Sequence, residues 1–223
     1  ALYFDEDSSS GQPKPETSDA FDLGFRYQSG IIQAQLSGWY TRYNNRLASA
    51  YDADCDCTVT RNLGRVDKYG IDGSVAVRPV KDLMFYVFGS YLKSEIKDDV
   101  QTSATAYAET AGKREAGAPT YTFGGRIQGT LGPVDLGLQV KRTGERYVND
   151  INTVKLPGYT LVDLDARFSL AQFGLEKTFF QLNVTNLFDK VYIGYSGTSL
   201  TGTSGTAYLG APRAISGSMV VAF

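Results

Sequence analysis

The chain has 223 residues, of which 42% are hydrophobic, and a formal net charge of −2. Its 22 basic and 24 acidic residues leave no basic surplus, so a nucleic-acid partner is not expected. Histidine is absent, which removes Ser-His-Asp and Cys-His catalysis and the commonest zinc sites. We therefore predict no enzyme and no cofactor. No run of about 18 apolar residues exists, so no transmembrane helix is predicted.

Alternation of apolar and polar residues predicts about nine strands. In the first, Phe21 and Leu23 alternate with Asp22 and Gly24. The strands are expected at 17–28, 31–50, 66–79, 83–96, 119–131, 134–147, 159–170, 179–187 and 215–223. Residues 83–96 leave the choice of faces open, because Met84–Phe88 is apolar at every position.

Short and long connections alternate strictly along the chain. Tight turns with Gly, Pro or Asp are expected at 28–30, 79–82, 131–133 and 171–175. Long connections fall at roughly 51–65, 97–118, 148–158 and 189–213. All long loops then gather at one end of the sheet, which is typical of outer-membrane barrels with short periplasmic turns and long extracellular loops. The predicted fold is all-β, an antiparallel transmembrane β-barrel segment with lipid against its apolar side.

Charged residues share the polar face of the predicted strands: Asp22, Arg26, Asp72, Arg78, Arg126, Asp135, Lys141, Asp163, Asp165 and Arg167. In a dry core each unpaired charge would cost several kcal/mol, whereas a wet lumen removes that cost. The simpler interpretation of most of them is that they form cross-strand ladders that stiffen the wall.

Four elements carry a family resemblance. They are Pro15–Arg26, Tyr69–Gly73 (Tyr-Gly-Ile-Asp-Gly), Asn183–Asp189 (Asn-Val-Thr-Asn-Leu-Phe-Asp), and Gly210-Ala-Pro-Arg213 before a terminal strand. Their order and spacing resemble the C-terminal β-barrel region of TonB-dependent outer-membrane receptors. The resemblance implies a bacterial outer-membrane location and a 22-stranded barrel with an N-terminal plug. Such a receptor imports scarce, bulky ligands, most often ferric siderophores, with energy passed on by TonB.

The chain departs from that pattern, since it has no plug, no TonB-contacting segment and only about nine strands. We interpret residues 1–16 as the remnant of an extracellular loop and 17–223 as the last strands of the barrel. The expected partners are outer-membrane lipid, the plug and remaining strands (in the same or a separate chain), the TonB complex through the missing plug, and a ferric siderophore. A plugless passive outer-membrane channel or a small stand-alone barrel is the alternative.

Aromatic and basic residues near the strand ends are the ligand candidates. Aromatic faces and guanidinium groups suit a large, usually anionic iron chelate, although aromatics at these places also form interfacial girdles. The candidates are Trp39, Tyr43, Arg46, Tyr51, Arg61, Arg65, Tyr107, Arg114, Arg142, Arg146, Tyr147, Tyr192, Tyr195 and Tyr208.

Both cysteines, Cys55 and Cys57, lie in one long loop. A disulfide across a C-x-C spacing is geometrically demanding, but an oxidising cell-surface setting favours such a loop staple. The acidic residues Asp52, Asp54 and Asp56 surround them, without the glycine and distal glutamate of an EF-hand loop. No metal site is predicted.

Overall fold

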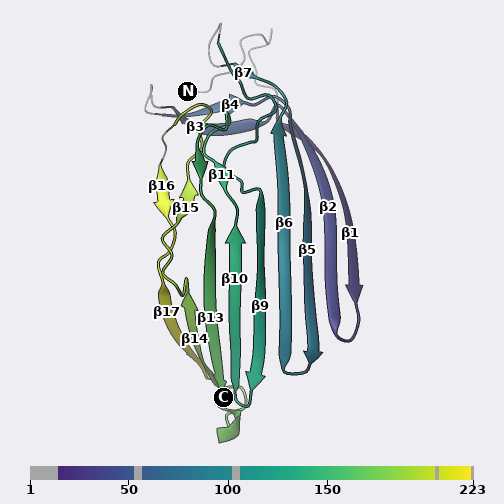
Figure 1. Cartoon of the computed structure of the whole chain (residues 1–223), viewed down its shortest axis with the longest axis vertical. Coiled ribbons are helices and arrows are strands. Elements are labelled where there is room, and N and C mark those ends of the chain that lie inside the picture. The colour runs from purple at the N-terminus through teal and green to yellow at the C-terminus, as the bar shows by residue number, and fades with distance from the viewer. Residues whose placement is uncertain (1–14, 53–56, 102–105, 204–205, 222–223) are drawn as a thin grey trace.

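Nine long strands form a single antiparallel sheet in the computed structural model, which describes residues 15–52, 57–101, 106–203 and 206–221. In the order in which they pair (Figure 1), they are β1 (Thr17–Gln28), β2 (Ile32–Asn44), β5 (Val66–Val80), β6 (Leu83–Ile96), β9 (Tyr121–Leu131), β10 (Val134–Thr143), β13 (Tyr159–Ser169), β14 (Phe179–Thr185) and β17 (Ala214–Val220). The predicted strand count is confirmed.

Each long connection contains a small two-stranded sheet of its own. The pairs are β3 (Leu47–Asp52) with β4 (Cys57–Asn62), β7 (Val100–Gln101) with β8 (Tyr107–Ala108), β11 (Arg146–Tyr147) with β12 (Lys155–Leu156), and β15 (Ile193–Ser196) with β16 (Ala207–Leu209). All four lie at the upper end of the sheet in Figure 1, and the tight turns lie at the other end.

Two predicted strands end several residues earlier than expected. The expectation of one strand over 31–50 is wrong, because the chain turns at Asn45, which has a φ of 53°, before β3 begins. The strand expected over 134–147 ends at Thr143 and is followed by Gly144. At the turn end, the expected tight turn at 171–175 contains a short 3-10 helix, η1 (Ala171–Phe173). Gly174 closes it with a φ of 79°, in the left-handed region that favours glycine.

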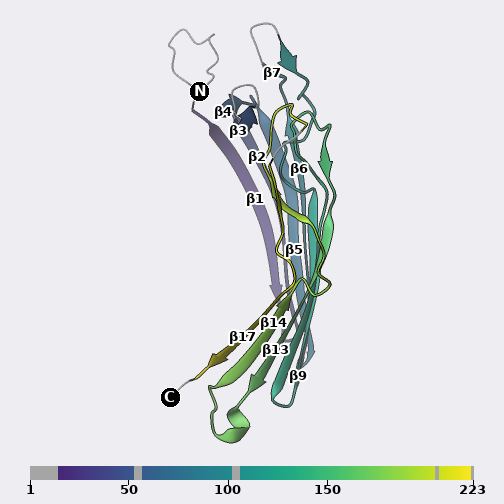
Figure 2. The ribbon, with the colours of Figure 1, turned by 90° about the vertical axis from the view of Figure 1, so that its left-hand side faces the viewer.

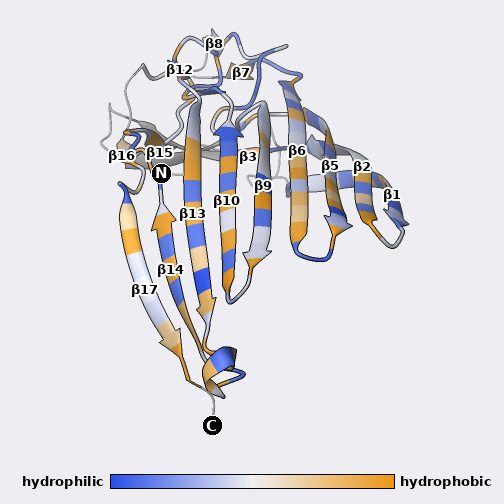
Figure 3. Ribbon diagram, turned by 60° about the horizontal axis from the view of Figure 1, so that its bottom comes forward, coloured by the Kyte–Doolittle hydropathy of each residue, from blue (hydrophilic) through white to orange (hydrophobic). Residues whose placement is uncertain are grey.

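The strand register separates an apolar face from a polar face. Across β1 and β2, Leu23 lies opposite Gly38 while Asp22 lies opposite Trp39. The register also settles β6, where Val87 pairs with Val75 on the apolar face. Figure 3 shows the resulting bands of alternating hydropathy along the strands. The apolar face has no covering layer in the described part of the chain: Leu23 is 71% exposed.

The sheet is curved but not closed (Figure 2). Strands β1 and β17 are its two edges, and every residue of both is exposed. An open edge leaves backbone N–H and C=O groups without partners, so the architecture is that of a partial barrel. Within the described residues, no helix has the length and apolar character needed to cross a membrane.

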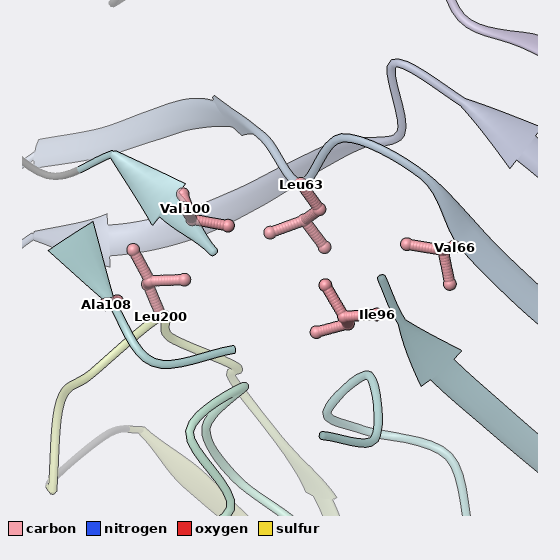
Figure 4. Packing of buried hydrophobic residues seen from close by; sticks show 6 residues of the cluster. All are labelled: Leu63, Val66, Ile96, Val100, Ala108 and Leu200. Atoms are coloured by element: carbon pink, nitrogen blue, oxygen red, sulfur yellow. The ribbon is translucent and has the colours of Figure 1, made fainter. Parts of the chain in front are cut away.

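The buried hydrophobic cluster lies among the loops, away from the middle of the sheet. Figure 4 shows its members converging from the long connections and the adjacent strand ends: Leu63, Val66, Ile96, Val100, Ala108 and Leu200. Tyr43 and Ile151 pack against this cluster. We call the described residues of 45–65, 97–120, 144–158 and 186–213 the loop cap. Three of its four connections supply residues to this core and the fourth contacts it through Ile151, so the connections are packed together.

Candidate ligand-binding site at the loop end

Long side chains on the polar face lie flat across glycines of the neighbouring strand. The indole Nε1 of Trp39 donates to Asp72 Oδ2 at 2.7 Å. The ring of Trp39 lies over Gly70, where an added Cβ would come within 2.7 Å of Cζ2. Likewise, a Cβ at Gly124 would come within 2.7 Å of the Phe88 ring. Glycine is therefore required at both positions for the rings to lie against the wall.

An ion pair lies across the polar face from β9 to β13. Arg126 donates to both carboxylate oxygens of Asp165, at 2.7 and 3.0 Å. Its guanidinium passes over Gly137 of the intervening strand β10, and a Cβ there would stand 2.2 Å from Nη2. This pair is a cross-strand ladder of the kind expected from the sequence.

A depression of about 350 Å³ opens on the polar face over β1, β2, β5, β6 and β9. Its lining mixes polar and apolar residues and includes one arginine, one aspartate and several hydroxyl groups. The lining residues are Gly24, Phe25, Arg26, Gln35, Leu36, Ser37, Asp72, Gly73, Ser74, Tyr86, Phe88, Gly89, Ser90 and Thr122.

Tyr43 is the centre of an ion network where β2 enters the loop cap. Arg46 donates to Glu16 at 3.0 Å and to Glu115 at 3.2 Å, and Lys68 also pairs with Glu115. Both cations lie over the Tyr43 ring, with Arg46 Cζ 4.9 Å and Lys68 Nζ 5.1 Å from its centroid. The network connects β2, β5 and the 97–120 connection, so two predicted candidates, Tyr43 and Arg46, are brought together.

A group of polar side chains, two buried and one half-buried, binds three loops to one another. Asn149 is fully buried; its amide donates to Thr153 at 2.7 Å and to the carbonyl of Gly202 at 3.0 Å. Asn152 accepts the backbone N–H of Arg114 at 2.8 Å and donates to its carbonyl at 2.7 Å. Asp150 accepts the N–H of Ala116 at 2.8 Å. We call Asn149, Asp150 and Asn152 the polar clasp.

Arg114 and Tyr147 lie together beside the polar clasp. Arg114 Cζ lies 5.8 Å from the centroid of the Tyr147 ring, and its Nη1 donates to Thr120 at 2.5 Å. The Nε of Arg114 is buried without a hydrogen-bond partner. On the other side, Lys155 contacts the Tyr147 ring at 5.2 Å and donates to Glu145 at 2.8 Å. The Lys155 ammonium lowers the pKa of the exposed Glu145 carboxyl.

Arg146 supports the β15–β16 hairpin from within. It is 5% exposed and donates to the carbonyls of Ile193 and Gly194 at 2.9 and 3.3 Å. The guanidinium of Arg146 is therefore hydrogen-bonded to backbone carbonyls of the hairpin.

Two tyrosine pairs lie along this hairpin. Tyr192 stacks at a tilt on Tyr159, with the ring centroids 4.3 Å apart, and its ring fills the space where a Cβ of Gly210 would be. Tyr195 and Tyr208 form the second pair, with centroids 5.9 Å apart. They are 64% and 59% exposed, so their faces remain accessible to a ligand.

The remaining candidates are dispersed. Tyr107 is an exposed residue of β8, and Arg65 is exposed with its backbone N–H bonded to Asp98 at 2.8 Å. Arg142 donates to Thr160 at 3.3 Å and pairs with Phe123 in the register, which places it on the apolar face. The side chains of Tyr51, Arg61 and Cys57, and all of Cys55, lie outside the described residues, so the disulfide prediction is not tested.

The Asn183–Asp189 motif acts as a structural clamp. Asn186 has a φ of 50° and donates to the carbonyls of Lys190 and Ala211, both at 3.0 Å. Asp189, with a φ of 51°, accepts the N–H of Arg213 at 2.8 Å. The two sequence motifs of this region are therefore bonded to each other at the base of the last loop.

Several residues of this site were not selected from the sequence. Glu16, Glu115 and Lys68 complete the ion network, and the polar clasp joins the loops. No spacing rule identifies them, because the partners that connect them to other segments lie 30 or more residues away in the sequence. Only Asn152 offers a local signal, as asparagine is among the residues that tolerate its φ of 59°. No group of three or more His, Cys, Asp or Glu side chains that could hold a metal occurs in the described ranges.

Known proteins share both the sequence pattern and the fold. Residues 2–187 match the family model described as TonB dependent receptor-like, beta-barrel. The ferrioxamine B receptor of Salmonella typhimurium (strain SL1344) is 27% identical over 220 residues, which cover 94% of this chain. The chain spans 29% of the length of that receptor.

Solved structures agree on the fold. The ferric yersiniabactin uptake receptor of Yersinia pestis is 21% identical with a TM-score of 0.68, covering 91% of this chain and 29% of its own. The copper transporter OprC is 15% identical with a TM-score of 0.70, covering 91% and 31%. At these identities the similarity establishes the architecture alone.

Proposed function

The chain belongs to the family of TonB-dependent receptor-like β-barrels, and on this premise we propose that it forms the last nine strands of a receptor that imports a ferric siderophore. Members of this family are barrels of the bacterial outer membrane, which is the location of this chain. The remaining strands, the plug and the TonB complex are the partners of the proposed receptor. Ferrioxamine B is the first ligand to test, because the curated relative is a receptor for it.

One observation supports this proposal above all. The sheet has an uncovered apolar face and, below the ordered loop cap, a polar face. Lipid covers an apolar face in an outer-membrane barrel, and the polar face then lines the interior. In this orientation the loop cap is extracellular and the tight turns are periplasmic. The unpaired edges β1 and β17 would meet the remaining strands of the barrel, which disfavours a stand-alone barrel of these strands alone.

The candidate residues differ in their surroundings. Tyr195 and Tyr208 are exposed rings on the β15–β16 hairpin. Tyr43 and Arg46 are held in the ion network where β2 enters the loop cap. Trp39 lies along the polar face and bonds to Asp72, and Arg146 supports the hairpin.

The test is iron uptake from ferrioxamine B by a strain that carries the full receptor in place of the deleted gene. Replacing both exposed rings, Tyr195→Ala with Tyr208→Ala, should weaken binding by about tenfold, because two aromatic contacts contribute roughly 1–2 kcal/mol. The matched control is Tyr91→Ala, since Tyr91 is 48% exposed but lies on the apolar face. Its binding should be unchanged.

A deletion strain that loses uptake of another chelate while retaining that of ferrioxamine B would reassign the ligand. Unchanged uptake from every iron chelate tested would contradict the siderophore proposal. Equal losses in the Tyr91 variant and in the double variant would contradict the assignment of the loop rings.

A further inference from the structure

Asp150 lies where three loops meet. Its side chain is buried, and its Oδ1 accepts the N–H of Ala116 from the 97–120 connection. Its own N–H lies 3.1 Å from the carbonyls of both Ser199 and Leu200, in the connection between β15 and β16. Asn149 and Ser199 form a parallel bridge beside it. Separating these loops would expose the Asp150 carboxyl to water.

We propose that Asp150 makes the closure of the loop cap depend on pH, with the loops held together more tightly when its carboxyl is protonated than when it is ionised. A buried carboxylate has lost its hydration, and one backbone N–H replaces only part of it. The neutral acid is easier to bury and still accepts the bond from Ala116. The proton is therefore bound more strongly in the closed cap than in the open one.

The charges around Asp150 do not neutralise it. Burial is the main cause that raises its pKa to about 6, and the nearby Glu115 adds to the rise. Lys68 acts in the opposite direction, but it is already paired with Glu115. Of the residues in the same connection as Asp150, Glu145 and Lys155 pair with each other.

Other charged groups lie farther along the contacting elements. The 196–202 segment contains no charged residue. In the 97–120 connection, Arg114 lies over Tyr147, and Lys113 forms no ion pair with a described residue. Arg46 is held between Glu115 and Glu16. Within the described residues, none of these cations forms an ion pair with Asp150, and Lys68 is the cation that lowers its pKa.

The direction of the pH effect follows from the raised pKa. In the open cap the carboxyl has its ordinary pKa of 3.8, and in the closed cap a pKa of about 6. The extra stability of the closed cap is therefore complete below the ordinary value and is lost as the pH rises through about 6. Between about pH 5 and about pH 7.5, the equilibrium constant for opening should rise by about tenfold.

The test is hydrogen exchange of the intact receptor in detergent, at these two pH values and corrected for the intrinsic exchange rate. Protection of peptides covering 149–152 and 198–202 should fall by about tenfold at the higher pH. Asp150→Asn keeps the oxygen that accepts the Ala116 N–H but cannot ionise, so its protection should not change with pH. An equal pH response in the wild type and in this variant would overturn the proposal.

The control lies in the same loop cap. The exposed Asp189 accepts the N–H of Arg213 at 2.8 Å at the base of the last loop, where no residue of the shared hydrophobic cluster lies, so protection of a peptide covering 211–214 should be the same at both pH values and in Asp189→Asn. This control region is measured in the same wild-type sample. A loss of protection there equal to that at 149–152 would also overturn the proposal. The comparison does not depend on whether Asp150→Asn folds. Exchange does not require a ligand, so the outcome is separate from that of the iron-uptake experiment.

Discussion

The sheet and the loop cap place the same residue types in opposite environments. On β5, Val66 is fully buried in the loop cap whereas Val75 is 42% exposed on the apolar face. The cap has a small hydrophobic core and buried polar bonds, as a water-soluble domain does. The wall leaves its large apolar side chains uncovered, because lipid is the medium that covers them. A single strand therefore packs in a protein interior at its loop end and faces lipid farther along its length.

The largest loss of stability is expected from a charge placed on the apolar face of the sheet. Val75→Arg lies near the middle of β5, and we expect a loss of about 2–4 kcal/mol in the free energy of unfolding, as for arginine at the bilayer midplane. The adjacent Ser74→Arg points to the polar face and should cost much less. Heat-dependent migration of the folded barrel in detergent gels measures both. Equal losses would show that the two faces do not differ in environment.

Removing buried volume from the loop cap tests its core. Val66→Ala should destabilise the cap by roughly 2 kcal/mol, since it deletes two buried carbons and leaves a cavity. Faster protease cleavage within 97–120 would report it while the barrel stays folded. The control Val75→Ala removes the same atoms from the apolar face, where lipid can occupy the space. If both variants were cleaved at the same rate, the cap would not depend on this core.

A smaller effect is expected on the polar face. Gly137→Ala places a Cβ where the Arg126 guanidinium lies, so the ion pair with Asp165 must move or break. Because both partners are partly exposed, the loss should be about 1 kcal/mol. Gly30→Ala serves as the contrast, because an added Cβ there meets nothing within 4 Å and Gly30 has no positive φ; its loss should be smaller. Denaturant unfolding that is insensitive to Gly137→Ala would mean that the pair adds nothing to the wall.

The alternation of side chains was sufficient to predict the sheet. Each polar–apolar repeat from Phe21 onward became a strand, because a half-exposed sheet must sort its two faces. Residues 83–88 could not be assigned in this way, since all are apolar. Their faces were decided by the neighbouring strands, where Ser74 lies opposite Phe88.

The site was harder to predict, because it depends on contacts between distant loops. Arg146 and Trp39 were selected as ligand candidates near the strand ends, yet Arg146 donates to backbone carbonyls and Trp39 donates to Asp72. Sequence alone does not show which polar groups are satisfied internally. For Arg142 a signal was present, since it has the same parity as Leu138 and Val140 on the apolar face.

The flattened side chains of the polar face have a consequence for transport. Trp39, Phe88 and Arg126 each lie sideways over a glycine, so they extend along the wall and project less into the space before it. A barrel lined in this way gains clearance without adding strands. In the proposed receptor, the three glycines beneath these side chains would leave more room for a bulky solute, while the aromatic and charged surfaces are retained along the wall.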